Sequence, residues 1–406
     1  MFQTILAKLF KRRHFWRYAT FSEVAELYAS RTMRLLALRM ISLFIALFMY
    51  QNGYSLLFIA CYFACYFSVK ALIAYPAARF AARFGPKHGI LLSNILYIPA
   101  LAAFTFVPEY GVPALIIFGL VQAWSVTMYD LCYLVDFSKV KNSEHAGKEL
   151  GYMQVLEKST TALSPLLGGF VAFCFGVEAT MWVAAIIFAL ASWPLMQSSE
   201  QVKTGQKLDF SGFPWRTTWR SLRAQSAIGF DVFTSTTVWI LFISLTVFVG
   251  SGDDLYLKIG ALTSVTFVTS FIAAYMFGRL IDRRRGRDLL RFSVFANSLL
   301  HLARPFMSTP AGIAMLNVGN ETATTGYSMA FTRGMFDTAD MTGKRIAYMF
   351  LIELALNVGS VLACLVFALC LWIFSANTVL GMQVFFGVAA IYTLGIAFPR
   401  FQLYRK

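Results

Sequence analysis

Apolar stretches of about twenty residues follow one another along the chain, and short polar segments separate them. A helix of that length crosses a hydrocarbon core about 30 Å thick and satisfies its own backbone hydrogen bonds. The pattern therefore predicts an all-α polytopic membrane protein with twelve transmembrane helices. We expect these spans at 33–51, 54–75, 88–107, 111–136, 149–174, 178–197, 227–249, 256–280, 288–306, 310–333, 346–373 and 378–398.

A longer polar segment in the middle of the chain divides the twelve spans into two groups of six. We expect two pseudo-symmetric six-helix bundles, at 33–198 and 227–399, with a short tail at 400–406. Residues 1–32 show an amphipathic pattern, which is typical either of a helix on a membrane surface or of an ordinary basic tail. In the central loop, 199–226, tryptophans alternate with arginines after Pro214, which predicts an amphipathic surface helix.

One short sequence occurs once in each half. GKELGYMQVLEK, 147–158, is matched by GKRIAYMFLIEL, 343–354, so that Glu157 corresponds to Glu353 with an offset of 353 − 157 = 196. Lys148 should lie at the water interface, and nine residues further on a helix reaches about 13 Å deeper. Both glutamates are therefore expected near the middle of the bilayer, at equivalent places in the two halves.

Charge and composition narrow the class of protein. The chain is 58% hydrophobic and carries a net charge of +15. Its basic residues gather in alternate loops, so the charge is attributed to the positive-inside rule and not to a nucleic-acid partner. We expect a multi-pass protein of the cell (inner) membrane, with both termini cytoplasmic. The basic residues that support this orientation are Arg79, Arg83, Lys87, Lys139, Lys141, Lys148, Lys203, Lys207, Arg216, Arg220, Arg223, Arg283, Arg284, Arg285, Arg287, Lys344, Arg345, Arg400, Arg405 and Lys406.

Several chemistries find no support in the sequence. It contains no phosphate-binding loop, no zinc-protease motif and no nucleophile elbow, so an ATP-driven pump or an enzyme is not expected. The six cysteines lie in or beside apolar stretches without a cluster of metal ligands. We therefore expect no cofactor and no metal.

Charged residues inside the predicted spans are the candidates for function. Each costs at least about 2.5–3.5 kcal/mol to insert, so it normally faces a partner or a wet cavity. Two interpretations stay open: buried ion pairs that fix helix packing, such as Lys158 with Asp130, or a proton site beside a cationic pocket. Burial also disfavours a charged carboxylate, which suits a group that takes up and releases protons. The candidates are Glu157, Glu353, Glu321, Asp130, Lys158, Arg39 and Lys70.

Two loop and helix motifs resemble those of a known family. GRLIDRRRGRD, 278–288, resembles the Gly-x-x-x-Asp-Arg-x-Gly-Arg loop of the major facilitator superfamily of secondary transporters, and SPLLGG, 164–169, resembles the Gly-Pro-x-x-Gly-Gly segment of its antiporters. ARFAARFGPKHG, 78–89, is the degenerate counterpart in the first half. The resemblance implies that these loops gate movement between the halves. The gate residues would be Gly278, Asp282, Arg283, Gly286, Arg287, Arg83 and Gly85.

The resemblance also implies a function. We expect a monomeric secondary active transporter that moves a small solute by alternating access, with H⁺ as the coupling ion. A lipid, lysolipid or drug-type exporter on the same scaffold is the alternative, so the substrate could be a small molecule or an amphipath. A non-transporting membrane scaffold is a more distant alternative.

Overall fold

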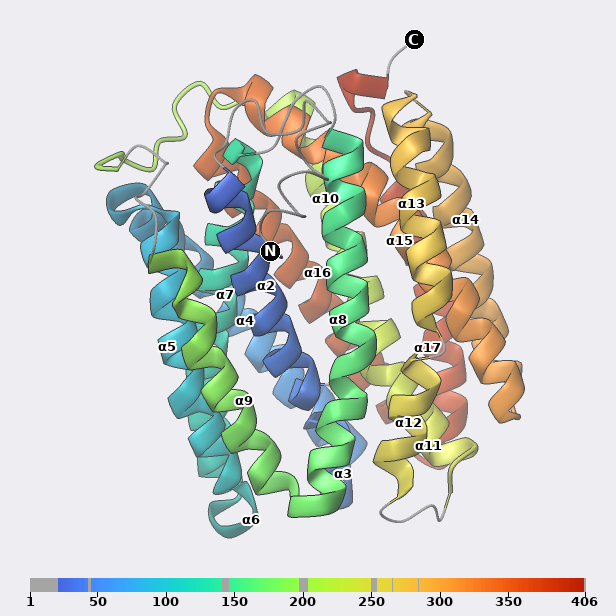
Figure 1. Cartoon of the computed structure of the whole chain (residues 1–406). Helices are drawn as coiled ribbons and strands as arrows, with labels where there is room; N and C mark the ends of the chain where they lie inside the picture. Colours follow the sequence, from blue (N-terminus) through green and yellow to red (C-terminus); the bar gives the residue numbers. More distant parts are fainter. Residues whose placement is uncertain are drawn as a thin grey trace, which may run out of the picture.

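The protein is an assembly of long helices, seen in a computed structural model (Figure 1). The structure describes residues 21–42, 45–140, 146–196, 204–249, 254–264, 266–283 and 285–404. Within these ranges there is no β-strand, which agrees with the predicted all-α class. The surface helix that we considered near the N-terminus lies mostly in residues 1–20, outside the described residues.

The first half of the chain supplies six spans. The first is built from α2 and α3, and the others are single helices joined by short turns. Their bounds are α2 Phe21–Ser42, α3 Ile45–Gln51, α4 Leu56–Phe84, α5 Pro86–Thr105, α7 Val112–Val140, α8 Ala146–Phe175 and α9 Val177–Ser192, with the short helices α6 Val107–Tyr110 and η2 Pro194–Met196.

The second half repeats this pattern with more interruptions. Its first span contains a π-helical turn, η3, between two α-helices, and its second span is divided into α12 and α13. The bounds are α10 Trp215–Phe233, η3 Thr234–Val238, α11 Trp239–Thr246, α12 Asp254–Ser264, α13 Thr266–Asp282, α14 Gly286–Ala303, η4 Arg304–Phe306, α15 Pro310–Thr342, α16 Arg345–Ile373, α17 Thr378–Thr393, η5 Leu394–Ala397 and η6 Gln402–Tyr404.

These helices correspond in order to the twelve predicted spans. Eight spans within the described residues are long and apolar enough to cross a membrane by length and composition alone. Of the others, α8, α14 and α15 carry more polar residues, whereas α12 and α13 are each too short because they divide one span between them. The first span differs in its start, because α2 begins at Phe21 and not near residue 33. Arg31 and Arg34 therefore belong to the helix and not to a preceding tail.

The predicted surface helix of the central loop is the beginning of the seventh span. α10 runs without a break from Trp215 to Phe233, because Ala224, Gln225 and Ser226 contain no helix-breaking residue. Its early turns carry the expected arginines and tryptophans, and its later turns are mostly apolar and largely buried. One helix therefore passes from the surface into the bundle.

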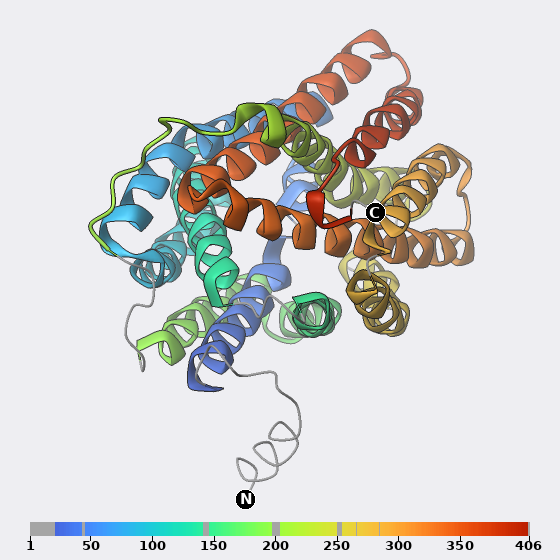
Figure 2. The same cartoon turned by 90° about the horizontal axis from the view of Figure 1, so that it is seen from above.

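Two ends of the bundle can be distinguished. The central linker, 204–214, and the C-terminal segment, 399–404, lie at one end, which we call the linker end; the turn at 51–55 lies at the opposite, far end (Figures 1 and 2). At the linker end, Lys344 Nζ donates to Asp209 Oδ2 at 2.7 Å. Hydrogen bonds from Lys344 and Ser211 hold the pKa of Asp209 well below its usual range. Asp209 therefore stays ionised at neutral and mildly acidic pH, and the linker stays tied to the start of α16.

The two halves meet along two helix pairs. α4 packs along α16, and α8 packs along α12 and α13 (Figure 2). Each pair joins one half to the other, and the two pairs lie on opposite sides of the bundle. We call the surface between the halves the seam.

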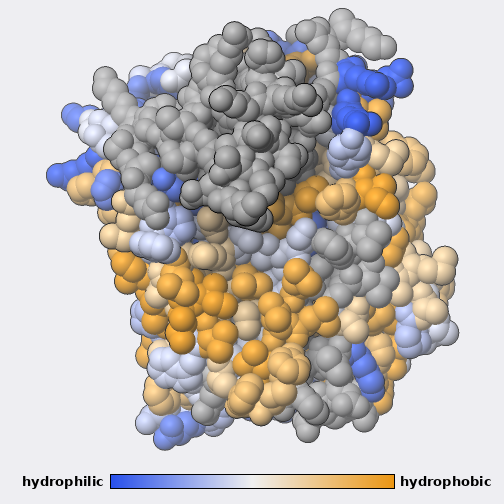
Figure 3. All heavy atoms as spheres, in the orientation of Figure 1, coloured by the Kyte–Doolittle hydropathy of each residue, from blue (hydrophilic) through white to orange (hydrophobic). Residues whose placement is uncertain are grey.

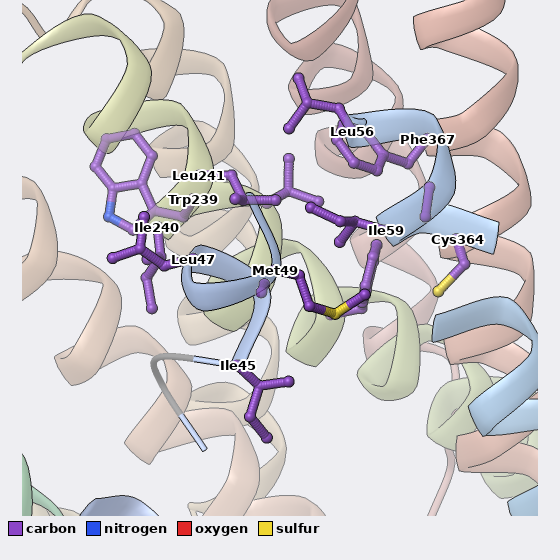
Figure 4. Close-up of a cluster of buried hydrophobic side chains, with 14 of the residues drawn as sticks. Ile45, Leu47, Met49, Leu56, Ile59, Trp239, Ile240, Leu241, Cys364 and Phe367 are labelled. Atoms are coloured by element: carbon purple, nitrogen blue, oxygen red, sulfur yellow. The ribbon is translucent and has the colours of Figure 1, made fainter. Parts of the chain in front are cut away.

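Hydrophobic clusters fill the seam near both of its ends. The far-end cluster includes Leu47 and Met49 of the first half together with Trp239 and Leu241 of the second (Figure 4). The linker-end cluster includes Phe137 of α7 and Phe336 of α15, whose ring centroids are 5.5 Å apart. Apolar packing therefore closes the seam on either side of its middle.

Helices α10 and α16 cross at glycines. A Cβ on Gly359 would overlap the carbonyl oxygen of Ser226, and one on Gly229 would overlap that of Leu356. The backbones approach more closely here than any other residue would allow. The outer surface is apolar as well: on the face in Figure 3, hydrophobic side chains form a band across the middle of the molecule.

Candidate functional site

A line of charges of alternating sign crosses the middle of the first half and reaches the second. Arg31 Nε of α2 donates to Glu157 Oε1 of α8 at 2.9 Å, and Arg31 Nη1 lies 4.0 Å from Asp130 Oδ1 of α7. Lys70 Nζ of α4 lies 3.9 Å from Asp130 Oδ2 and 3.6 Å from Glu353 Oε1 of α16. The order is therefore Glu157, Arg31, Asp130, Lys70 and Glu353. The two glutamates of the repeated sequence are its two ends.

The end of this line at Glu353 is the most deeply buried. The Lys70 and Glu353 side chains are 6% and 2% exposed. Asn357, one turn further along α16, donates to Glu353 Oε1 at 2.8 Å. A carboxylate that has an ammonium 3.6 Å away and accepts a hydrogen bond from an amide is compensated for part of the cost of its burial.

A second ion pair crosses the seam on its other side. Lys158 of α8 donates to Glu321 of α15. Lys158 therefore pairs across the seam and not with Asp130 of its own half, the example that we gave for a packing interaction. Adjacent residues on α8 serve different partners, since Glu157 faces α2 while Lys158 faces α15.

Arg39 stands apart from these pairs. It lies two turns beyond Arg31 on α2 and is partly buried. Its Nε atom is buried without a hydrogen-bond partner among the described residues. The Nε donor of Arg39 is therefore unsatisfied, and it lies in the first half, between the line of charges and the far end.

The second half contains a buried polar network that joins α10, α14 and α15. Asp231 Oδ1 lies 2.5 Å from His301 Nε2 and accepts from Asn297 Nδ2 at 3.1 Å. Its other oxygen accepts from the hydroxyl of Tyr327. Arg304 lies at the end of this network and donates to Ser235 of the π-helical turn at 2.9 Å and to Asn320 at 3.0 Å.

The first half has an equivalent network with the opposite charge. Arg34 of α2 donates to Asn94 Oδ1 of α5 at 2.6 Å, and its guanidinium lies 3.9 Å from the centre of the Tyr129 ring of α7. Arg34, Asn94 and Tyr129 stand 197, 203 and 198 residues before Asp231, Asn297 and Tyr327. A charge, an amide and a tyrosine thus tie the first, third and fourth helices together in each half.

The loops expected to act as gates lie at the linker end. Gly85 ends α4 with φ of 95°, a conformation that favours glycine, and Arg83 is exposed beside the Phe84 ring. The linker hydrogen-bonds to this loop, because Gly205 N donates to Arg83 O at 3.0 Å. The first-half loop is therefore attached to the chain that joins the halves.

In the second-half loop, Gly286 packs against the Tyr404 ring of the C-terminal segment, and Gly278 is buried. Arg283 and Arg287 are exposed. The side chain of Asp282 lies outside the described part of the chain. The gate role of these residues stays a prediction.

The sequence identified many but not all members of this arrangement. Lys70, Asp130, Glu157, Lys158, Glu321 and Glu353 all take part in the ion pairs of the middle. Arg31 and Arg34 were missed because we began the first span too late. We did not predict that Asp231, His301 and Arg304 form one network. The offset of about 196 residues between the two halves aligns Asp231 with Arg34, and it could have indicated this network.

Two six-span halves around a buried, charged seam define a multi-pass helical membrane protein. The family model described as the Major Facilitator Superfamily matches residues 27–364, and the chain belongs to this superfamily. That membership indicates a transporter rather than an enzyme.

Solved structures agree with this fold. The chain is similar to the transporter FucP in its outward conformation, with a TM-score of 0.67, 14% identity, and coverage of 91% of this chain and 97% of that one. A second solved structure of FucP names it as the E. coli fucose:proton symporter. The chain is also similar to the human organic anion transporter MFSD10, with a TM-score of 0.68, 11% identity, and coverage of 94% and 98%. No curated protein matches the chain in sequence. At these identities the likeness concerns the fold.

Proposed function

We propose that this protein is a proton-coupled secondary transporter that carries a small polar solute by alternating access. The observation that supports this most strongly is the line of charges from Glu157 to Glu353, which ends on both halves of the molecule. When the halves move, the contact between Lys70 and Glu353 must stretch or break. A carboxylate that loses its cation in a medium of low dielectric binds a proton more readily.

The second seam-crossing pair supports the same mechanism. Lys158 and Glu321 also join one half to the other, and both are less buried than Lys70 and Glu353. A polar solute that enters between these pairs can replace their mutual contacts by contacts to itself. Binding of solute and protonation would then bias the same movement.

The fold also suggests an orientation. The linker end carries the exposed arginines Arg79, Arg83, Arg216, Arg220 and Arg400. By the positive-inside rule this end would face the cytoplasm, with both chain termini on that side of the cell membrane. We further propose that the monomer is the functional unit, because the seam lies within one chain.

The test uses purified protein in proteoliposomes that contain a pH-sensitive dye. The solutes offered are neutral monosaccharides including fucose, amino acids, and mono- and dicarboxylates. We expect at least one of them to cause a proton flux, and the double variant Glu157→Gln/Glu353→Gln to reduce that flux at least tenfold. Glu109→Gln, which removes an exposed carboxylate at the far end, is the matched control and should leave it unchanged.

Loss of folding must be separated from loss of coupling. Each variant is compared at equal amounts of monodisperse protein, and Glu157→Gln alone serves as a milder change, because Arg31 keeps Asp130 as a neighbour. Solute exchange that survives without its pH dependence would support coupling through these groups. Unimpaired pH-dependent transport by the double variant would remove both glutamates from the mechanism.

A further inference from the structure

A cavity opens at the linker end, away from the seam charges. It has a volume of about 450 Å³ and lies between the first turns of α10, the last turns of α15 and the C-terminal segment. Figure 2 shows these parts of the second half from the linker end. None of the transport residues discussed above lines it.

The cavity is strongly basic. Arg216, Arg220 and Arg400 line it, and among the residues that the structure describes no aspartate or glutamate does. Asp340, on the neighbouring part of α15, pairs instead with Arg345 at 2.5 Å. The local charge is therefore uncompensated within the cavity wall, which favours an anionic ligand.

The arginines supply the charged donors that such a ligand meets, and the side-chain amide of Gln402 also lines the cavity. The hydroxyls of Thr217, Thr338 and Thr342 also line the cavity, but each donates its proton to a carbonyl oxygen of the protein, at 2.8–2.9 Å. Guanidinium groups bind phosphate in a planar, bidentate geometry. The beginning of α10 adds a partial positive charge in the same place.

Two tryptophans indicate how deep in the membrane the cavity lies. Trp215 and Trp219 are 50% and 53% exposed, and each precedes one of the arginines. Two rows therefore run side by side along α10, one aromatic and one basic, about 100° apart around the helix. Exposed tryptophans are typical of the membrane–water interface, where their rings lie at the level of the lipid headgroups.

We propose that this cavity binds the phosphate of an anionic phospholipid from the leaflet at the linker end. Arg216, Arg220 and Arg400 hold the phosphate, and the tryptophan row of α10 contacts the glycerol and upper acyl chains. Because α10 is the first part of the seventh span, and α15 carries Glu321, a bound lipid holds together two helices of the second half and the chain's C-terminal segment.

Binding is measured on the full-length protein in detergent, by thermal unfolding and by mass spectrometry of the intact protein with retained lipid. The probes are phosphatidylglycerol, phosphatidylcholine as a zwitterionic lipid, and inorganic phosphate. We expect phosphatidylglycerol to bind and raise the unfolding temperature. The triple variant Arg216→Gln/Arg220→Gln/Arg400→Gln should weaken its affinity roughly tenfold to a hundredfold.

The matched control is Arg79→Gln/Arg279→Gln/Arg291→Gln, which removes the same charge from exposed arginines outside the cavity and should keep the lipid affinity. If the triple variant is not monodisperse, Arg220→Lys replaces it, since lysine keeps the charge but not the bidentate geometry. Equal losses in both triple variants would overturn the proposal in favour of diffuse charge attraction. Equal stabilisation by inorganic phosphate and by phosphatidylglycerol would overturn the assignment to a lipid.

Discussion

Lys70 and Glu353 form an ion pair across the seam that is more deeply buried than that of Lys158 and Glu321. Removing two charges from water is costly, and the pair recovers that cost only through its geometry and through the amide of Asn357. Breaking it by changing one partner is therefore worse than replacing both partners by apolar groups.

At this site we predict that Glu353→Gln lowers the free energy of unfolding by up to about 3–5 kcal/mol, because the Lys70 ammonium stays buried with Asp130 as its remaining carboxylate among the described residues. Lys70→Met/Glu353→Leu should recover most of that loss. Denaturant unfolding in a mild detergent measures both, with Glu109→Gln as the exposed control. A double variant that is less stable than the single one would contradict the prediction.

Individual charges were easier to predict than their partners. Lys70, Asp130 and Glu353 are recognisable because each interrupts an apolar stretch. Lys158 shows what the sequence does not give. Spacing along one helix predicts how deep a residue lies, but not the direction in which it faces. The packing of α8 against α15 is what brings Lys158 to Glu321. His301 and Arg304 gave no signal of joining Asp231, because their contacts span three helices.

At the scale of elements, the crossing of α10 and α16 depends on two glycines. Gly229 and Gly359 let the backbones touch, and Ser360 Oγ donates to Gly229 O at 3.0 Å at the same place. A glycine inside a helix such as Gly359 can allow either a bend or the close approach of a second helix. The structure shows close packing, since α16 runs unbroken from Arg345 to Ile373.

We predict that Gly359→Ala costs about 1–3 kcal/mol of stability, because the added methyl group forces the two helices apart. Gly387→Ala in α17 is the control, since no atom lies within 4 Å of the added Cβ. Thermal unfolding of both variants in detergent provides the measurement. If the two variants have equal stability, the backbones at this crossing are not in contact as described.

The hydrophobic pattern predicted the order of the helices more reliably than it predicted where each helix begins and ends. α10 shows why: Trp215 to Arg223 is amphipathic and the residues after Ala227 are mostly apolar, so we divided the segment where its composition changes. Helix continuity depends on hydrogen bonding and on the absence of a breaker, and both continue across that change.

At the scale of the whole molecule, apolar clusters close the seam at the far end and at the linker end. Alternating access requires one cluster to separate while the other holds. The halves were predictable from the repeated sequence, but their closure at both ends was not, since it depends on contacts such as that between Phe137 and Phe336.

We therefore predict that joining the halves at the linker end stops transport. In a cysteine-free background, Phe137→Cys/Phe336→Cys is treated with a short, cleavable thiol cross-linker, and flux of whichever solute is transported should fall at least tenfold and return on cleavage. The control pair Phe48→Cys/Phe104→Cys, whose rings are 5.0 Å apart within the first half, should have little effect. Full transport through the cross-linked Phe137 and Phe336 pair would exclude separation at this place.

The pairs of Lys70 with Glu353 and of Lys158 with Glu321 are oriented the same way across the seam. In both, the first half supplies a lysine, Lys70 or Lys158, and the second half a glutamate, Glu353 or Glu321. In these pairs the positive charges lie on the first half and the negative charges on the second, so the electric field across the seam has one direction. A dipolar cargo would settle there with its negative pole toward the first half, and the same cargo turned end for end would be repelled at both poles.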